Sequence, residues 1–463
     1  MFNRKNKMRK RFNFVRTLLA LFAVIVPLTA ASAAAVKTLI DYFQPAPIYD
    51  KLSTTAWGAA AVGPRDIHNG LEDTTIKQWC YWDGKIIKGP DGKYHMFASR
   101  WDQSKGHSGW GGSVAMHAVS DKPTGPYVDK GMCWPDNEGG KGHNVTAIEL
   151  PDGTYAVLVS TTRPGDVFTS NSLDGPWTYK GSVQIDANGF SAPKAQNLSL
   201  VIRPDGSYVM VSTHGVIMLS TNGIMGPYKV QGPAVYPTNV PGFSNDSEDP
   251  VIWYSGGQYH IVANWFSERK ALHLTSPDGI KNWKNMGLAY DPTTNFVRYT
   301  DGTVNHWNKM ERPGVLIENG HVTHFTLAVI DVDKSQELGN DTHGSKVIVI
   351  PFDGAAFDGV ASNRANGVGP ALARGISLSV NVRGSAARGT VFIPDEAASG
   401  SARLSVALYD LKGRLAAYEY KGTTIGKNQE VSLDFNGSRV VPGVYCISVR
   451  YGSRNFYGRL GVR

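Results

Sequence analysis

The sequence predicts an all-β protein that consists of a five-bladed β-propeller followed by a small C-terminal β-sandwich. Three features predict this architecture: a hairpin pattern that occurs five times between residues 82 and 328, a turn motif that recurs between the copies, and a series of short alternating strands after residue 375. A repeat of this period is typical of solenoids, propellers and arrays, because one unit alone cannot bury its apolar face.

Each of the five hairpins begins with a polar residue and continues as an apolar strand, a turn that contains glycine, and a second strand. The opening residues are Asp83, Asn144, Asn197, Asp249 and Arg312. Each lies 10 or 11 positions before the Tyr or Val of the second strand, and those residues recur every 51 to 63 positions. The constant offset predicts five equivalent β-hairpins.

A Gly-Pro-aromatic motif stands between the hairpins. It occurs at residues 125–127, 175–177 and 226–228, with a looser Lys-Asn-Trp form at residues 281–283. We interpret it as the turn into the outermost strand of a four-stranded blade. Five such units over residues 36–358 predict a five-bladed propeller, in which radial repetition leaves only short, protected edges.

The N-terminal segment predicts export. Residues 1–17 carry seven Lys/Arg and no acid, residues 18–28 are apolar, and Ala31-Ser32-Ala33 fits a signal-peptide cleavage pattern. The apolar run of 11 residues is short for a membrane span. We expect residues 1–35 to be a signal peptide and the protein to be secreted or at the cell surface, without an integral membrane segment after signal removal. A membrane anchor is the alternative.

The net charge of +8 does not indicate a nucleic-acid partner, because seven of the basic residues lie in the N-terminal segment. Residues 36–370 carry 27 basic and 33 acidic residues, and residues 371–463 carry 13 and 6, so an acidic body precedes a basic tail. No zinc pattern or phosphate-binding loop occurs, and no cofactor or metal is predicted. A disulfide between Cys80 and Cys133 is compatible with export, but the spacing does not establish it.

A second domain is expected after a linker at residues 359–375, which lacks periodicity and is rich in Gly, Ala and Asn. Short alternating strands separated by turns fill residues 376–463 and predict a β-sandwich. Residues 408–414, 441–445 and 458–463 resemble the C-terminal sorting domains of type IX secretion cargo. The resemblance implies secretion machinery as a partner, and an accessory carbohydrate-binding sandwich is the alternative.

The chemistry is expected where the blades meet, because the innermost strand of each blade lines the propeller axis. The residue pairs that open the five hairpins are Trp82-Asp83, His143-Asn144, Gln196-Asn197, Glu248-Asp249 and Glu311-Arg312. Side chains alternate along a strand, so about one member of each pair faces the axis. Carboxylates, an arginine and a histidine from distant parts of the chain would then share one pocket.

At this point the chain resembles glycoside hydrolase family 43 and its five-bladed relatives over residues 40–358. The resemblance rests on the blade pattern, on the Trp82-Asp83 opening and on the Glu311-Arg312-Pro313 sequence of the fifth blade. It implies that Asp83 is the general base. The second and third blades offer Asn144 and Asn197 where the family has an orienting Asp and a general-acid Glu. Either the acid is Glu248 or Glu311, or the chain represents a divergent family with its own arrangement, or the propeller no longer hydrolyses.

The residues themselves also favour a glycosidase. Glycosidic bond hydrolysis needs one carboxylic acid and one carboxylate, and inverting enzymes hold them about 6.5–9.5 Å apart. We therefore expect a monomeric, secreted glycoside hydrolase that cleaves plant or algal polysaccharide or oligosaccharide by acid/base catalysis at the propeller axis. The expected catalytic residues are Asp83, Glu248 and Glu311. The expected substrate-binding residues are Trp82, Trp101, Trp110, His143, Asn144, Asn197, Asp249 and Arg312, with Trp101 and Trp110 at the cleft rim.

Two other functions remain open. A polysaccharide lyase acting on uronic-acid polymers would use a base such as His143 and a cation, for which Arg312, Arg100 or Arg163 could serve, to neutralise the substrate carboxylate. A non-catalytic sugar-binding propeller would keep the aromatic residues and need no carboxylate pair. In either case each carboxylate could instead be part of a salt bridge that ties neighbouring blades.

Overall fold

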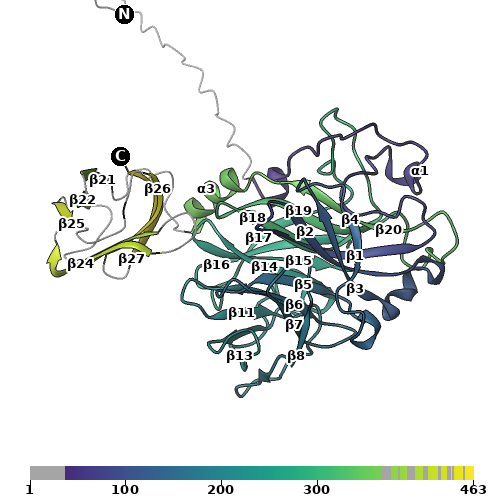
Figure 1. Cartoon of the computed structure of the whole chain (residues 1–463), viewed down its shortest axis with the longest axis horizontal. Helices are drawn as coiled ribbons and strands as arrows, with labels where there is room; N and C mark the ends of the chain where they lie inside the picture. Colours follow the sequence, from purple (N-terminus) through teal and green to yellow (C-terminus); the bar gives the residue numbers. More distant parts are fainter. Residues whose placement is uncertain are drawn as a thin grey trace, which may run out of the picture. The chain divides into compact units, whose positions relative to one another are not determined.

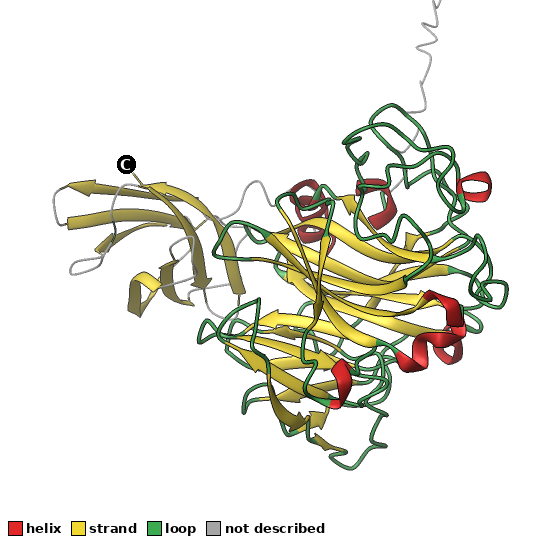
Figure 2. Cartoon of the chain, turned by 45° about the vertical axis from the view of Figure 1, so that its right-hand side comes forward, coloured by secondary structure: helices red, strands yellow, loops and turns green. Residues whose placement is uncertain are grey.

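The computed structural model describes residues 37–365 and, in the C-terminal part, seven strands within residues 377–462. The predicted signal peptide at residues 1–35 and residues 366–375 of the predicted linker lie outside the described residues. Figure 1 shows strands of residues 79–351 grouped in successive small sheets, and Figure 2 shows that short helices occur only at their margins.

Five antiparallel sheets follow one another along the chain and confirm the five-bladed propeller. Blade 1 consists of β1 (Trp79–Lys88), β2 (Tyr94–Asp102), β3 (Val114–Ser120) and β4 (Val128–Met132). Blade 2 consists of β5 (Val145–Glu149), β6 (Tyr155–Val159), β7 (Asp166–Ser170) and β8 (Thr178–Ser182). In both blades the order of the strands in the sheet follows their order in the sequence.

Blades 3 and 4 repeat this arrangement. Blade 3 consists of β10 (Ser199–Ile202), β11 (Tyr208–Val211), β12 (Ile217–Ser220) and β13 (Tyr228–Val230), with the short β9 (Ile185–Asp186) added in parallel at its outer edge. Blade 4 consists of β14 (Ser247–Ser255), β15 (Gln258–Trp265), β16 (Lys270–Ser276) and β17 (Lys284–Tyr290). The Gly-Pro-aromatic turns and the Lys-Asn-Trp turn precede the outermost strands, as predicted.

The prediction of four strands in every blade is wrong for blade 5. This sheet contains only β18 (Lys309–Glu318), β19 (His321–Ile330) and β20 (Ser345–Pro351), because the chain then turns into α3 (Gly354–Ala365). The helix includes the first residues of the predicted linker.

The segment before β1 covers the outer edge of β20. Leu71 and Phe43 form isolated bridges with Val347 and Phe352. The Asn69 side chain donates to Val349 O at 2.8 Å and accepts from Val349 N at 3.1 Å, so one amide side chain satisfies both backbone groups of a β20 residue. This segment also contains η1 (Leu39–Tyr42) and α1 (Ala59–Val62). It substitutes for the missing fourth strand.

Aromatic side chains fill the spaces between blades. Trp134, which follows β4, stacks on Phe168 of β7 with ring centroids 3.7 Å apart, and this joins blades 1 and 2. Trp253 of β14 packs against Phe325 of β19 with ring centroids 5.8 Å apart, which joins blades 4 and 5, and both are buried. Full burial of such a side chain contributes about 1.5–3 kcal/mol, so these contacts hold the blades in a fixed arrangement.

The C-terminal region forms two antiparallel sheets. One contains β21 (Ser377–Arg383), β22 (Ala386–Ile393) and β25 (Gln429–Asp434), and the other contains β24 (Leu415–Ile425), β23 (Ala402–Tyr409), β26 (Gly443–Tyr451) and β27 (Arg454–Val462). Strands β21 and β27 lie against each other, which gives the predicted β-sandwich. Within the described part of the chain, no helix is both long and apolar enough to cross a membrane.

Candidate active site

The residues that open the five hairpins share one unusual backbone conformation. Asp83, Asn144, Asn197, Asp249 and Arg312 have φ values of 69°, 56°, 47°, 52° and 50°. Non-glycine residues in this left-handed region cost of order 1–3 kcal/mol and persist only where the surrounding structure holds them. At these positions in blades 1, 4 and 5, the pairing between the first two strands of the blade shifts its register. One such kink in each blade redirects the side chain at the start of the inner strand.

These five side chains form a polar ring, which we define as Asp83, Asn144, Asn197, Asp249 and Arg312. Arg312 Nε donates to Asp83 Oδ1 at 2.9 Å, and Arg312 Nη1 lies 3.4 Å from Asp249 Oδ1. Asn144 Nδ2 donates to Asn197 Oδ1. The ring therefore ties blade 5 to blades 1 and 4, and blade 2 to blade 3. All its members except the half-buried Asn197 are buried.

Asp83 makes the largest number of contacts in the ring. Besides the Arg312 contact, its Oδ2 accepts from Val145 N at 3.0 Å and from the Ser99 hydroxyl. A carboxylate offers about four lone-pair sites, so three are occupied and one on Oδ1 remains for a water. Its role as general base stays a prediction.

A second group of carboxylates lies beside the ring. Glu248, Asp249 and Glu311 each offer an oxygen, and these oxygens lie within 4.8 Å of one another. Burial and the negative charges of Asp249 and Glu311 raise the pKa of Glu248 to about 8. Burial raises the pKa of Asp249 to about 6, although Arg312 opposes the change. Glu248 is half-buried and is therefore the member that a ligand can reach.

Glu311 has the opposite electrostatic environment. Burial alone would raise its pKa, but the ammonium groups of Lys334 and Lys309 lower it below its ordinary value. Lys309 Nζ lies 3.0 Å from Glu311 Oε1, and Lys334 Nζ donates to Oε2. At neutral pH this carboxyl group is ionised while the Glu248 carboxyl group retains its proton. Two glutamates in one cluster thus differ in charge.

Sequence reasoning missed Lys334, Asn264 and Tyr290. Lys334 follows β19 in a segment that belongs to no repeat. Both amide atoms of Asn264 and the Tyr290 hydroxyl are buried and have no hydrogen-bond partner among the described residues. Asn264 lies opposite Glu248 in the β14–β15 register. Buried polar groups normally have partners, so this side of the cluster is suited to a polar ligand.

The aromatic residues that were predicted to bind substrate differ in their exposure to solvent. Trp110, in η3 (His107–Gly112), is 39% exposed, and its ring centroid lies 5.1 Å from that of His143. The rim position predicted for Trp101 is wrong, because its ring packs against Trp82 and is 2% exposed, and its Nε1 donates to Gly106 O. Trp82 is also buried. An unpredicted exposed aromatic ring, Phe266, lies over the Lys309 ammonium group.

His143 precedes Asn144 of the polar ring, and Cys80 and Cys133 lie at the two ends of blade 1. His143 shares a hydrogen bond of 2.9 Å with the Ser113 hydroxyl, and burial lowers its pKa to about 4, so the ring is neutral at pH 7. Cys80 and Cys133 are both free thiols, and the structure contains no disulfide between them. Cys80 instead lies with its Sγ 3.9 Å from Glu337 Oε2.

A cavity of about 160 Å³ lies beside the polar ring and has Arg312 among its lining residues, whereas Glu248, Asp249 and Glu311 do not line it. Its walls are the parts of β1, β5, β10, β14 and β18 that follow the ring residues. Lys85 donates from this wall to Val315 O at 2.7 Å, and burial lowers its pKa to about 8. The carboxylate cluster therefore does not lie inside this axial cavity.

No family profile and no curated protein sequence matches this chain. Solved structures with a similar fold include an α-L-arabinofuranosidase from Podospora anserina (13% identity, TM-score 0.42, 62% of this chain and 94% of that one). A family-43 β-1,3-galactosidase (14%, 0.41, 59% and 90%) and an exo-β-1,3-galactanase from Phanerochaete chrysosporium (13%, 0.40, 81% and 93%) are also similar. The activities in these descriptions are those of the similar proteins.

Proposed function

We propose that the protein is a glycoside hydrolase in which Glu248 donates the proton to the departing glycosidic oxygen. The observation that carries the proposal is the opposed environment of Glu248 and Glu311, since two carboxyl groups with separated pKa values are the usual basis of acid and base roles. Glu248 is protonated at neutral pH and reachable. Ionised Glu311 keeps the proton on Glu248 and stabilises positive charge that develops on the sugar.

The surroundings of the cluster support a carbohydrate substrate. Trp110 and Phe266 present exposed aromatic faces, and the buried Asn264 and Tyr290 offer unpaired polar atoms. A sugar ring presents apolar faces and several hydroxyl groups, so it can use both kinds of group at once. We retain plant or algal oligosaccharides and polysaccharides as the proposed substrate class.

We assign the activation of water to Asp83, which the sequence predicts as the base. Asp249 is the second candidate, because a pKa near 6 suits a base that works near neutral pH. Loss of a general base typically costs about 10²–10⁴-fold in rate. Asp83→Asn and Asp249→Asn should therefore differ: the variant that loses the base should recover turnover, with an altered product, when azide is added as an external nucleophile.

The decisive experiment tests Glu248→Gln on two substrates. A natural oligosaccharide has a poor leaving group that needs a proton, whereas an aryl glycoside with a dinitrophenol leaving group does not. We expect the variant to lose at least two orders of magnitude in turnover on the first substrate and to retain most of it on the second. Equal losses on both substrates would remove Glu248 as the acid. New absorbance near 235 nm would instead indicate a lyase, and binding without turnover a sugar-binding propeller.

The lyase alternative has less support from the geometry. Each candidate cation is already paired with a carboxylate: Arg312 with Asp83 and Asp249, Arg100 with Asp129, and Arg163 with Asp166. A substrate carboxylate would have to displace these partners. We therefore propose hydrolysis as the main function.

We also propose that residues 1–35 direct export and that the C-terminal sandwich acts in sorting to the cell surface. The basic and apolar N-terminal pattern and the sorting-domain resemblance of the last 60 residues support this proposal. The protein should be found outside the cell in a host with type IX secretion, and fractionation of such cells tests this.

A further inference from the structure

The axial cavity beside the polar ring has one charged position in the layer that follows the ring. The residues two positions after each ring member all line the cavity, and they are Lys85, Thr146, Ser199, Val251 and Gly314 in blades 1 to 5. These positions are equivalent in the five repeats. Blade 1 therefore places an ammonium group where the other blades place a hydroxyl group, an apolar side chain or no side chain.

Lys85 has a single hydrogen-bond acceptor. Its Nζ donates to Val315 O of β18 at 2.7 Å, so the side chain reaches from blade 1 to blade 5. An ammonium group carries three N–H donors, and the described residues offer Lys85 no second acceptor and no carboxylate. Burial lowers the pKa of Lys85 to about 8, and no negative charge opposes this change. At pH 7 the group is therefore a cation with two unused donors.

Other buried lysines of the propeller do have negatively charged partners. Lys309 Nζ lies 3.0 Å from Glu311 Oε1, and Lys346 Nζ contacts the Glu72 carboxylate. Such pairing is the rule for buried charges, because an isolated ion that leaves water loses its hydration without compensation. Lys85 is an exception to this rule among the lysines that the structure describes inside the blades.

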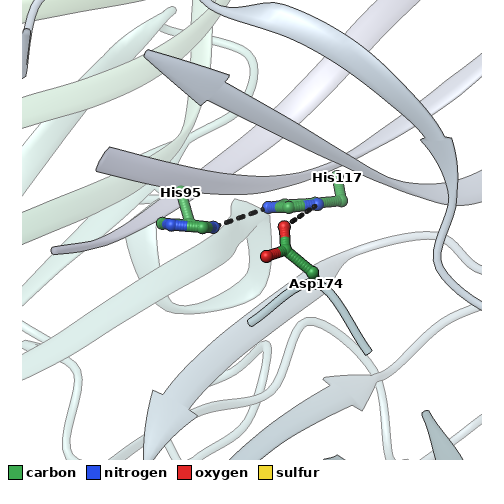
Figure 3. Close-up of side chains that lie close together, drawn as sticks. All are labelled: His95, His117 and Asp174. Atoms are coloured by element: carbon green, nitrogen blue, oxygen red, sulfur yellow. Dashed lines mark hydrogen bonds and ion pairs between the residues drawn. The ribbon is translucent and has the colours of Figure 1, made fainter. Parts of the chain in front are cut away.

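Buried histidines of blade 1 also have partners or are neutral. His95 Nδ1 lies 2.9 Å from His117 Nε2, so one ring donates to the other (Figure 3). The other nitrogen of His95 lies 3.2 Å from Asp91 Oδ1. Asp174 Oδ1 lies 3.9 Å from His117 Nδ1, which is beyond hydrogen-bond distance, and burial lowers the pKa of His117 to about 4, so this ring is neutral at pH 7. His117 thus leaves no charge to balance, whereas Lys85 does.

The rest of the cavity wall does not supply the missing negative charge. Among the described residues that line the cavity, Arg312 is the only other charged one, and its guanidinium group already contacts Asp83 and Asp249. Ser199 adds a donor, because its Oγ accepts from Ile252 N at 3.2 Å and the described residues provide no acceptor for its hydroxyl hydrogen. Lys85 is therefore the unpaired charge of this cavity, and donors remain unused on two of its walls.

We propose that the axial cavity binds a small monovalent anion, such as chloride, that pairs with the Lys85 ammonium group. A volume of about 160 Å³ holds about five water-sized species at about 30 Å³ each, so an ion and several waters of its hydration shell fit. One unpaired ammonium group favours one negative charge, since any excess would itself be a buried charge without a partner. Ser199 can donate to the ion or to one of these waters.

The ion acts at the junction of the first and last blades. Lys85 reaches from β1 to β18, and the same two strands are joined by the contact of Arg312 with Asp83. In the closed propeller the anion removes the cost of a buried, unpaired ammonium group, whereas the unfolded chain leaves Lys85 in water and gains nothing from the ion. Anion binding should therefore stabilise the folded state.

The first test measures the melting temperature of the full chain while sodium chloride replaces sodium gluconate at constant ionic strength. We expect a rise that saturates, because a single site fills. Lys85→Met keeps most of the aliphatic side chain and removes the ammonium group, so it should weaken chloride binding by about tenfold or more. In the wild type the rise should diminish above about pH 8, where Lys85 loses its proton.

Lys88→Met is the matched control for this titration. Lys88 lies on the same strand as Lys85 and reaches the same neighbouring blade, where its Nζ lies 3.0 Å from Glu318 Oε1, but it does not line the cavity. Since the control removes an ammonium group outside the cavity, Lys88→Met should keep the full response to chloride.

A second test locates the ion directly in the wild-type protein. A crystal soaked in sodium bromide should show an anomalous bromine signal in the axial cavity, within hydrogen-bond distance of Lys85 Nζ. The proposal is overturned if the cavity shows no bromine signal, if Lys85→Met responds to chloride as the wild type does, or if Lys88→Met loses the response.

Discussion

At the scale of single residues, the difference between two glutamates determines the chemistry that the site can perform. Glu248 and Glu311 have the same side chain, yet one has a raised and the other a lowered pKa. The cause is the distribution of neighbouring charges: Glu248 faces carboxylates, and Glu311 faces two ammonium groups. From the sequence alone, Glu248 and Glu311 were equally good candidates for the general acid. Lys334, which lowers the pKa of Glu311, lies outside the repeats and was not predicted to be near it.

The first prediction concerns pH. A proton donor works only in its protonated form, so its contribution is present below its pKa and lost above it. Because the pKa of Glu248 is raised to about 8, kcat/KM on a natural oligosaccharide should fall about tenfold per pH unit above that value. This decrease in kcat/KM should be absent for an aryl glycoside with a dinitrophenol leaving group, which needs no proton. A loss of activity that begins near pH 5 would contradict this assignment.

The second prediction concerns the ion pair of Asp83 and Arg312. Both groups are buried, and removing a buried partner so that a charge is left uncompensated costs about 3–5 kcal/mol. Arg312→Met leaves Asp83 without its cation and should lower the free energy of unfolding by about this amount. Asp83→Asn should lower it by less, because Arg312 keeps its contact with Asp249.

The double variant of Asp83 and Arg312 should be less destabilised than the sum of the two single changes, by about 1–3 kcal/mol. Urea denaturation of the four proteins measures this coupling. Strict additivity would mean that the pair does not hold the blades together.

At the scale of elements, the hairpin is the unit that sequence analysis identifies best. Its opening residue, glycine turn and second-strand aromatic lie at constant offsets, so five equivalent units could be found without coordinates. The shared left-handed φ at the opening residues explains why polar residues recur there: asparagine and aspartate tolerate this conformation, although Arg312 does so at greater cost. The incomplete fifth blade could not be predicted, because a side chain replaces strand pairing at its edge.

The third prediction concerns that edge. Asn69 is 3% exposed and satisfies both backbone groups of Val349. Asn69→Ala would leave a buried N–H and a buried C=O without partners, at about 1–3 kcal/mol each. We expect thermal unfolding at a clearly lower temperature.

Asn69→Asp is the matched control. A neutral carboxyl group can accept from Val349 N and donate to Val349 O, so at acidic pH this variant should be destabilised less than Asn69→Ala. Once ionised, the group loses the donor and adds a buried charge, so its stability should fall as the pH rises. Equal melting temperatures for Asn69→Ala and the wild type would show that the edge is satisfied in another way.

At the scale of the whole molecule, the sequence predicted a propeller followed by a sandwich, and the structure shows both folds with separate sheets. The strand pattern and the charge balance both change after residue 370, and they were sufficient to predict the change of fold. The division into two independent domains stays a prediction. The candidate site was only partly predictable. The opening pairs could be located, but the burial of Trp101 and the proximity of Asn264 and Tyr290 to the carboxylates depend on how the blades pack.

The fourth prediction separates the two domains by function. Deletion of residues 371–463 should leave turnover of soluble oligosaccharides unchanged, because the proposed catalytic residues all lie in the propeller. In a host with type IX secretion, the shortened protein should accumulate in the periplasm. Unchanged export together with lost turnover would reverse the roles assigned to the two domains.

The contacts of Asn69 with Val349 have a consequence for the order in which the chain can fold. They join residues 280 positions apart, and the bridges of Leu71 to Val347 and of Phe43 to Phe352 span similar sequence separations. Contacts between such distant residues form slowly, because a long loop must close before they add any stability. When the ribosome has synthesised the first four blades, the segment that contains Phe43, Asn69 and Leu71 therefore still lacks the β20 residues that it contacts. The propeller closes only after β20 has been synthesised, so translation itself sets the earliest time at which the fold can be complete.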